Sequence, residues 1–229
     1  MNAKRIIAIF EKDMKDFLKN MMLLTMPLLP VVLALIYERM GNELPISLIY
    51  LIVGVTFSAV TSSVMMTMMA EENEKKTLRG LILSPASFLD IIIGKSLVTG
   101  LITFISLIVS LMIVGIGPFL DFRVIIGLIL LFLFFLLLGI GIGLFSKSIA
   151  ATSAYLMPLM FLFGFTPMIY SLGLSEDSMA IAIADTFPLM QAIEAHETSS
   201  WSPTGIVALW VMGAAIFMYI CFKKTTTDD

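Results

Sequence analysis

Six long apolar runs dominate the chain and limit what it can fold into. A membrane-spanning helix needs about 20 mostly apolar residues, with a range of about 17–25. Runs of this length lie at residues 21–37, 47–69, 97–117, 124–145, 149–172 and 204–222. Hydrophobic residues make up 59% of the 229 residues. In a soluble domain this share is about 45–50%. We therefore predict an all-α polytopic membrane protein with six transmembrane helices.

Prolines predict irregular geometry in the first and fifth runs. Proline has no backbone N–H and kinks or breaks a helix that contains it. The first run contains Pro27 and Pro30, and the fifth contains Pro158 and Pro167. The second of these lies in the stretch GFTPMIY, so the fifth helix is expected to break there before it reaches the far surface.

The distribution of Lys and Arg predicts the orientation in the membrane. Cytoplasmic loops carry an excess of these residues, and an even number of spans puts both termini on one side. Only Arg39 and Arg123 fall on the side opposite the termini. The other 12 of the 14 are Lys4, Arg5, Lys12, Lys15, Lys19, Lys75, Lys76, Arg79, Lys95, Lys147, Lys223 and Lys224. We predict a multi-pass plasma-membrane protein with both termini in the cytoplasm.

The first 20 residues have the pattern of an amphipathic helix. One helical stripe collects apolar side chains, and most of the charges lie elsewhere. The stripe consists of Ile6, Ile7, Phe10, Met14, Phe17 and Leu18. Such a pattern predicts an interfacial helix at 1–20 lying on the cytoplasmic leaflet. A plain solvated leader is the alternative.

The apolar runs lack ionisable residues, and this disfavours several kinds of function. None of the six contains Asp, Glu, Lys, Arg or His, and such residues mark proton and ion pathways when they occur in membranes. One cysteine, Cys221, and one histidine, His196, offer little for metal binding or redox chemistry. The GKS at 94–96 lacks the earlier glycine of a phosphate-binding loop, since position 89 is Leu89. We expect no cofactor, no metal and no nucleic acid on this chain, and we interpret Lys95 as an interfacial anchor.

The charged stretch EENEKKTLRGLILSPAS at 71–87 stands out after the second run. Read as a helix, it places Leu78, Leu81 and Ile82 on one apolar face, and the Ser84-Pro85 pair ends it. Such a helix, joined directly to two spans, can transmit a movement of a cytoplasmic partner to those spans. A charged loop that only fixes topology is an equal alternative. An intramembrane protease built on the two adjacent glutamates is a weaker one, because the single histidine is predicted on the opposite side of the membrane.

This stretch resembles the hallmark segment of the ABC transporter type-2 permeases. The resemblance departs from the family pattern at Lys76 and Arg79. In layout it extends over the whole chain, as a single transmembrane domain of 1–229. The matching positions are Glu72, Glu74, Thr77, Leu78, Leu81, Leu83, Ser84, Pro85, Gly94 and Lys95.

The resemblance implies the permease subunit of an ATP-driven exporter of an amphiphilic cargo such as a peptide, a drug or a lipid-like molecule. Such a subunit pairs with a second copy or a paralogue, and a separate ATP-binding cassette subunit uses the ATP and Mg. A cytoplasmic coupling helix at 71–84 would dock on that subunit, and the external segment at 172–203 would form short re-entrant helices. The implied docking residues are Glu71, Glu72, Glu74, Lys75, Thr77, Leu78, Arg79, Leu81, Ile82, Ser84 and Pro85.

The second run carries a stripe of hydroxyls and methionines. In the resembled family this span lines the dimer interface and any path through it. The candidate pathway or interface residues are Thr56, Ser58, Ser62, Met65, Met66 and Met69. The alternative is that the hydroxyls satisfy backbone carbonyls and the methionines fill gaps in the packing. A channel or facilitator that works without an ATPase is the competing function.

Overall fold

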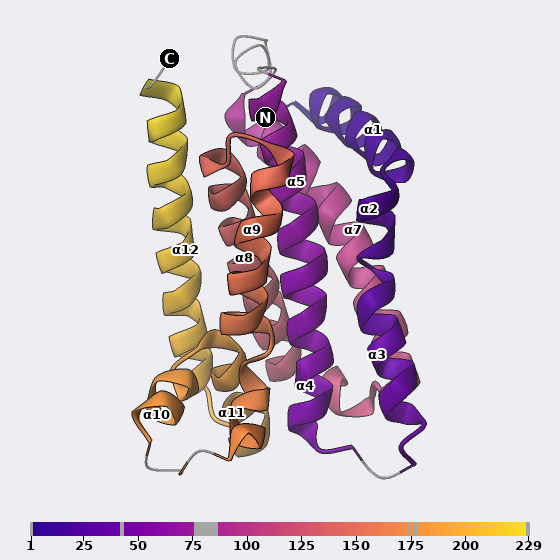
Figure 1. Ribbon diagram of the computed structural model, residues 1–229, viewed down its shortest axis with the longest axis vertical. Coiled ribbons are helices and arrows are strands. Elements are labelled where there is room, and N and C mark those ends of the chain that lie inside the picture. Colours follow the sequence, from indigo (N-terminus) through magenta and orange to yellow (C-terminus); the bar gives the residue numbers. More distant parts are fainter. Residues whose placement is uncertain (1, 42–43, 76–86, 174, 176–177, 228–229) are drawn as a thin grey trace.

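A computed structural model describes residues 2–41, 44–75, 87–173, 175 and 178–227, and all regular secondary structure in this part of the chain is helical. The helices stand side by side as a bundle, with both termini at one end (Figure 1). Among the described residues, five helical segments are long and apolar enough to cross a membrane, namely Met21–Glu38, Ile46–Glu74, Leu89–Val114, Phe122–Phe145 and Ser202–Thr225. The protein is therefore an all-α, multi-pass membrane protein.

The fifth predicted span is bent. Helix α9 (Ile149–Leu159) continues as the π-helical segment η3 (Met160–Gly164) and is followed by the 3-10 segment η4 (Thr166–Leu172). The two halves meet at an angle of 68°. The expected break at GFTPMIY is confirmed, and the bundle has six spans when this pair counts as one.

The first span is likewise interrupted at a proline. Helix α1 (Ala3–Lys19) is followed by the short α2 (Met21–Thr25) and then by α3 (Leu28–Glu38). Pro27 lies at the junction of α2 and α3, where its missing N–H does the least harm. Helix α1 lies obliquely across the end of the bundle that holds the termini (Figure 1).

The second span forms the centre of the bundle. It runs through α4 (Ile46–Val55), the π-helical segment η1 (Thr56–Ser62) and α5 (Ser63–Glu74) without a break. Every residue from Ile49 to Ala70 is buried within the single chain. The other helices therefore surround this span.

The third span begins earlier than the apolar run suggests. Helix α7 (Phe88–Val114) starts at a capping box, in which Ser87 and Asp90 exchange side-chain-to-backbone hydrogen bonds. The sequence boundary at residue 97 left Asp90 and Lys95 outside the membrane helix. In the structure both lie in the N-terminal part of α7, which at 27 residues is longer than the about 20 residues that cross a bilayer, so the absence of charged residues from the membrane stays a prediction.

The fourth and sixth spans complete the bundle. Helix α8 (Phe122–Phe145) packs on α5 with Gly139 and Gly143, and on α12 (Ser202–Thr227) with Gly141. Helices α10 (Met179–Asp185) and α11 (Pro188–Thr198), with η2 (Gly117–Leu120), lie at the end away from the termini (Figure 1). Short helices thus occupy the region where re-entrant ones were predicted.

Candidate functional site

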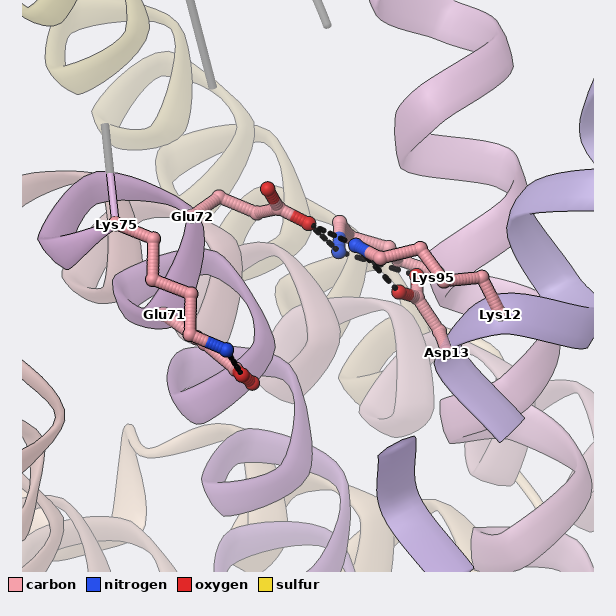
Figure 2. Close-up of polar contacts among 6 residues, drawn as sticks. All are labelled: Lys12, Asp13, Glu71, Glu72, Lys75 and Lys95. Carbon is pink, nitrogen blue, oxygen red and sulfur yellow. Dashed lines mark hydrogen bonds and ion pairs between the residues drawn. The ribbon is translucent and has the colours of Figure 1, made fainter. Parts of the chain in front are cut away.

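Three helices meet in a charged cluster at the end of the bundle that holds the termini. Helix α1 contributes Lys12 and Asp13, the last turn of α5 contributes Glu72, and the second turn of α7 contributes Lys95. Figure 2 shows the two ammonium groups and the two carboxylates converging on one point. Residues from three distant parts of the sequence are therefore held together by charge.

The centre of this cluster is excluded from solvent. The Lys95 side chain is 2% exposed, and those of Asp13 and Glu72 are 4% exposed each. Lys95 Nζ lies 3.1 Å from Asp13 Oδ2 and 3.1 Å from Glu72 Oε1. A buried charge is tolerated when it is paired and hydrogen-bonded, and each group here has a partner of opposite sign.

Lys12 closes the cluster from the solvent side. Its Nζ donates to Glu72 Oε1 at 2.7 Å and lies 3.6 Å from Asp13 Oδ1. Partial burial lowers the pKa of Lys12, but its hydrogen bond to Glu72 and the nearby carboxylates outweigh that effect and raise the pKa above 10.5. Two cations thus balance two anions at neutral pH.

Gly94, the first residue of the GKS stretch, lets α1 pack closely on α7. A Cβ at Gly94 would lie 2.7 Å from Ile9 Cγ2 and 3.2 Å from the Ile6 carbonyl oxygen. A side chain at this position would push α1 away, so the glycine permits the contact and Lys95 holds it. The interpretation of Lys95 as an interfacial anchor is wrong, because the side chain points into the protein rather than toward the membrane surface.

The residues after Glu72 tie α5 to two further helices. Asn73 Nδ2 donates to the carbonyl oxygens of Gly143, Leu144 and Ser146, at 3.3, 2.8 and 3.2 Å. These carbonyls belong to the C-terminal end of α8, which has no helical donors left for them. Glu74 Oε2 accepts from the backbone N–H of Ile149 at 2.8 Å, at the first residue of α9. The last turn of α5 therefore contacts α1, α7, α8 and α9, and we call residues 71–75 the junction turn.

The predicted docking residues fall into three groups. Glu72 and Glu74 face other helices of the chain, as described above. Glu71 and Lys75 form an ion pair at the surface, apart from the buried cluster (Figure 2), and this pairing raises the pKa of Lys75. Outside the described residues lie Thr77, Leu78, Arg79, Leu81, Ile82, Ser84 and Pro85.

The polar stripe of the second span lies inside the single chain. Thr56, Ser58, Ser62, Met65, Met66 and Met69 are all 0% exposed. Ser62 Oγ donates to the Phe135 carbonyl at 2.9 Å, and Thr56 and Ser58 donate to carbonyls of their own helix. A second copy or a cargo reaches these side chains only if the surrounding helices separate. The hydroxyls satisfy backbone carbonyls here, as the alternative interpretation held, and a role in a pathway stays a prediction.

The geometry does not support a protease. His196 lies in α11, at the end of the bundle opposite Glu72 (Figure 1). Its Nδ1 lies 3.2 Å from the Tyr50 hydroxyl, and its ring packs edge-on against Tyr50 and Phe119. The glutamates and the histidine therefore cannot act on one substrate atom.

Comparison with known families agrees with this architecture. A family model described as ABC-2 family transporter protein matches residues 6–222. The chain belongs to this family. No curated protein matches the chain significantly. Members of the ABC-2 family are membrane components of ABC transporters, so this protein is a permease-type subunit of an ABC transporter. Family membership implies partnership with an ATP-binding cassette subunit.

The buried cluster of the ABC-2 subunit was missed by the sequence reasoning, although the sequence contains two signals for it. Asp13 lies three residues after Phe10 and four before Phe17, on the apolar stripe of α1. Lys95 lies four residues after Ile91 and three before Val98, both of which are 0% exposed. A charge of each sign on the apolar faces of two neighbouring helices predicts a buried pair.

Proposed function

We propose that this chain is the membrane-spanning subunit of an ATP-driven exporter, and that it moves an amphiphilic cargo outward as part of a permease dimer. A separate cassette subunit would bind and hydrolyse ATP with Mg. The cassette subunit would dock on the segment around 71–84. Closing of the cassettes on ATP would move the helices of this chain. Both termini would lie in the cytoplasm with the docking segment.

The junction turn carries the proposal. It is the first part of the predicted docking segment at 71–84, and its side chains bond to four helices that start or end at the same end of the bundle. Glu72 joins α1 and α7, Asn73 joins α8, and Glu74 joins α9. A displacement applied just after residue 75 therefore reaches these helices through direct polar contacts. Packed helices of this kind move as rigid bodies between discrete arrangements.

Co-purification and transport test the proposal. We expect a neighbouring gene to encode the cassette ATPase. The chain would be expressed with that ATPase, purified as a complex and reconstituted into proteoliposomes. ATPase stimulation would be screened with amphipathic peptides, drugs and lipid-linked molecules, and uptake of the best stimulant would be followed. We expect a stable complex and transport that requires ATP.

Two substitutions separate docking from transmission. Leu81→Glu places a charge on the apolar face of the predicted docking segment and is expected to weaken binding of the cassette subunit. Glu72→Gln changes the buried cluster and is expected to leave binding intact while lowering the transport achieved for each ATP hydrolysed. Glu11→Gln, on the exposed side of α1, is the matched control. Flux of the same cargo without ATP or a cassette subunit would contradict the proposal and favour a channel or facilitator.

A further inference from the structure

An open groove lies beside the buried charged cluster, between the turn that joins α1 to α2 and the last turn of α5. Its volume is about 490 Å³, within the about 300–1,000 Å³ that is typical of small-molecule sites. The groove combines charges of both signs with two apolar side chains, which is the composition of a site for an amphiphile. Its lining residues are Asp16, Lys19, Asn20, Met21, Met22 and Glu71.

The groove lies at the boundary between the apolar and the charged parts of two spans. The first apolar run starts at Met21, and the apolar run of the second span ends at Met69, two residues before Glu71. Met21 is 76% exposed and Met22 is 49% exposed, although both line the same groove as three charged residues. Apolar side chains at such a boundary insert between the headgroups and the acyl chains of a bilayer. A lipid of the leaflet nearest the termini is therefore the molecule that meets this groove in a membrane.

The charges of the groove are complementary to a zwitterion. The carboxylates of Asp16 and Glu71 can accept hydrogen bonds from a primary ammonium group, which has three N–H donors. Lys19, in the last turn of α1, can pair with a phosphate. Two carboxylates repel a lipid of net negative charge, and the trimethylammonium group of a choline lipid has no N–H to donate. The groove therefore matches a phospholipid that carries a primary amine.

The Lys75 side chain shows that an ammonium group fits these carboxylates. Its Nζ forms an ion pair with Glu71 at the surface of the protein (Figure 2). The hydrogen bond to Glu71 is the main cause of the raised pKa of Lys75, and the charge of Asp16 adds to it. Exposed ion pairs of this kind are weak. The ammonium group of a lipid can therefore take the place of the Lys75 ammonium.

We propose that this groove binds the headgroup of a phospholipid with a primary amine, from the leaflet at the end of the bundle that holds the termini. The lipid ammonium binds Asp16 and Glu71 in place of Lys75. The lipid phosphate pairs with Lys19, and the acyl chains run along the two exposed methionines. The site consists of residues of the single chain, so it is tested without a cassette subunit and stands apart from the proposed transport function.

Native mass spectrometry of the detergent-purified chain tests this lipid site. Phosphatidylethanolamine, phosphatidylcholine and phosphatidylglycerol with the same acyl chains would be added together at equal concentrations. The three lipids differ in mass, so the share of each in the complex with one bound lipid can be measured. Two exposed ion pairs of ordinary strength favour the amine lipid by about fivefold. We expect this preference for phosphatidylethanolamine over each of the other two lipids.

Charge substitutions at the groove decide the outcome. Asp16→Asn and Glu71→Gln are each expected to lower the preference by about twofold, and together to remove it. Glu11→Gln, an exposed carboxylate of α1 outside the groove, should keep the preference. Lys75→Gln removes the competing ammonium group and should strengthen the preference, whereas Lys15→Gln, with the same loss of charge on the exposed side of α1, should not change it.

Three results would overturn the proposed lipid site. These are a share of phosphatidylethanolamine no larger than that of either other lipid, an unchanged preference in a folded Asp16→Asn/Glu71→Gln variant, or the same change in Lys15→Gln as in Lys75→Gln. If the double variant loses its helical circular dichroism, the comparison of Lys75→Gln with Lys15→Gln decides.

A soluble competitor separates a lipid from a free amine phosphate. Glycerophosphoethanolamine has the same headgroup without acyl chains, so it should not displace phosphatidylethanolamine at an equal concentration. Displacement under this condition would also overturn the proposal, because the exposed Met21 and Met22 would then contribute nothing to binding.

Discussion

Replacing Lys95 by methionine should destabilise the fold strongly, because it removes the cation at the centre of the buried cluster. Asp13 and Glu72 would stay in place with side chains only 4% exposed and with Lys12 as their shared partner. Breaking a buried ion pair by removing one partner costs about 3–5 kcal/mol. For a chain of this size, about 1 kcal/mol corresponds to about 2–4 °C in the unfolding midpoint. We therefore expect the midpoint of Lys95→Met to fall by about 6–20 °C.

Two further variants separate charge from packing. Lys95→Met/Asp13→Asn removes one charge of each sign and leaves Glu72 paired with Lys12 at 2.7 Å. It should recover most of the loss, with a remaining deficit of about 1 kcal/mol for the hydrogen bond no longer made. Lys75→Met is the surface control, since the Lys75 side chain is 62% exposed, and such exposed pairs contribute about 0–1 kcal/mol.

Thermal unfolding in nanodiscs, followed by the loss of helical circular dichroism, measures these midpoints. An unfolding midpoint of Lys95→Met within about 2 °C of that of the unmodified chain, which corresponds to at most about 1 kcal/mol, would contradict this prediction. A Lys95→Met/Asp13→Asn variant that is no more stable than Lys95→Met would contradict it as well. In either case the cluster would owe its burial to packing of the helices rather than to charge balance.

Three other outcomes follow from the structure. Asn73→Asp should lower the unfolding midpoint more than Asn73→Ala, because a carboxylate would face the carbonyl oxygens at the C-terminal end of α8 instead of donating to them; equal midpoints would contradict this. Gly143→Ala should destabilise the contact of α8 with α5, since its Cβ would lie 2.6 Å from Met69 Cβ, whereas Gly127→Ala on the same helix meets nothing within 4 Å and should be neutral. Burial lowers the pKa of His196 below 6.5, and the nearby charges of Glu197 and Asp121 oppose this effect. The packing of α11 on the bundle is therefore fully stable above about pH 6.5 and weakens as the pH falls toward the lowered pKa. Hydrogen exchange of the α11 amides, corrected for intrinsic rates, should show this loss between pH 7 and pH 5, and His196→Gln should abolish it.

The fold class could be predicted because lipid leaves the backbone few choices. Long apolar runs must be helical to satisfy their N–H and C=O groups, and proline positions mark where those helices bend. The break after Gly164 and the interruption between α2 and α3 at Pro27 were therefore visible in the sequence. Both depend on local chemistry alone.

The helix boundary at the start of the third span could not be predicted by counting apolar residues. Asp90 and Lys95 are charged, so a count stops short of them, but each has its own partner in the fold. Asp90 accepts from the backbone N–H groups of Ser87 and Asn2, and Lys95 is paired across two helices. A charge belongs inside a helix bundle when another segment supplies its counter-charge, and that segment can be far away in the sequence.

The sequence by itself determined that the chain is a helical membrane protein of six spans, and its charged stretch indicated the family to which it belongs. Only the tertiary structure decided which side of each helix faces its neighbours. It turned Glu72 from a predicted surface residue into a buried ion-pair partner, and it enclosed the hydroxyl stripe of the second span within the bundle. Helical periodicity places residues on a face, but the partner of that face is selected by close packing at Gly94, Gly143 and Gly164, where the absence of a side chain lets one backbone reach another.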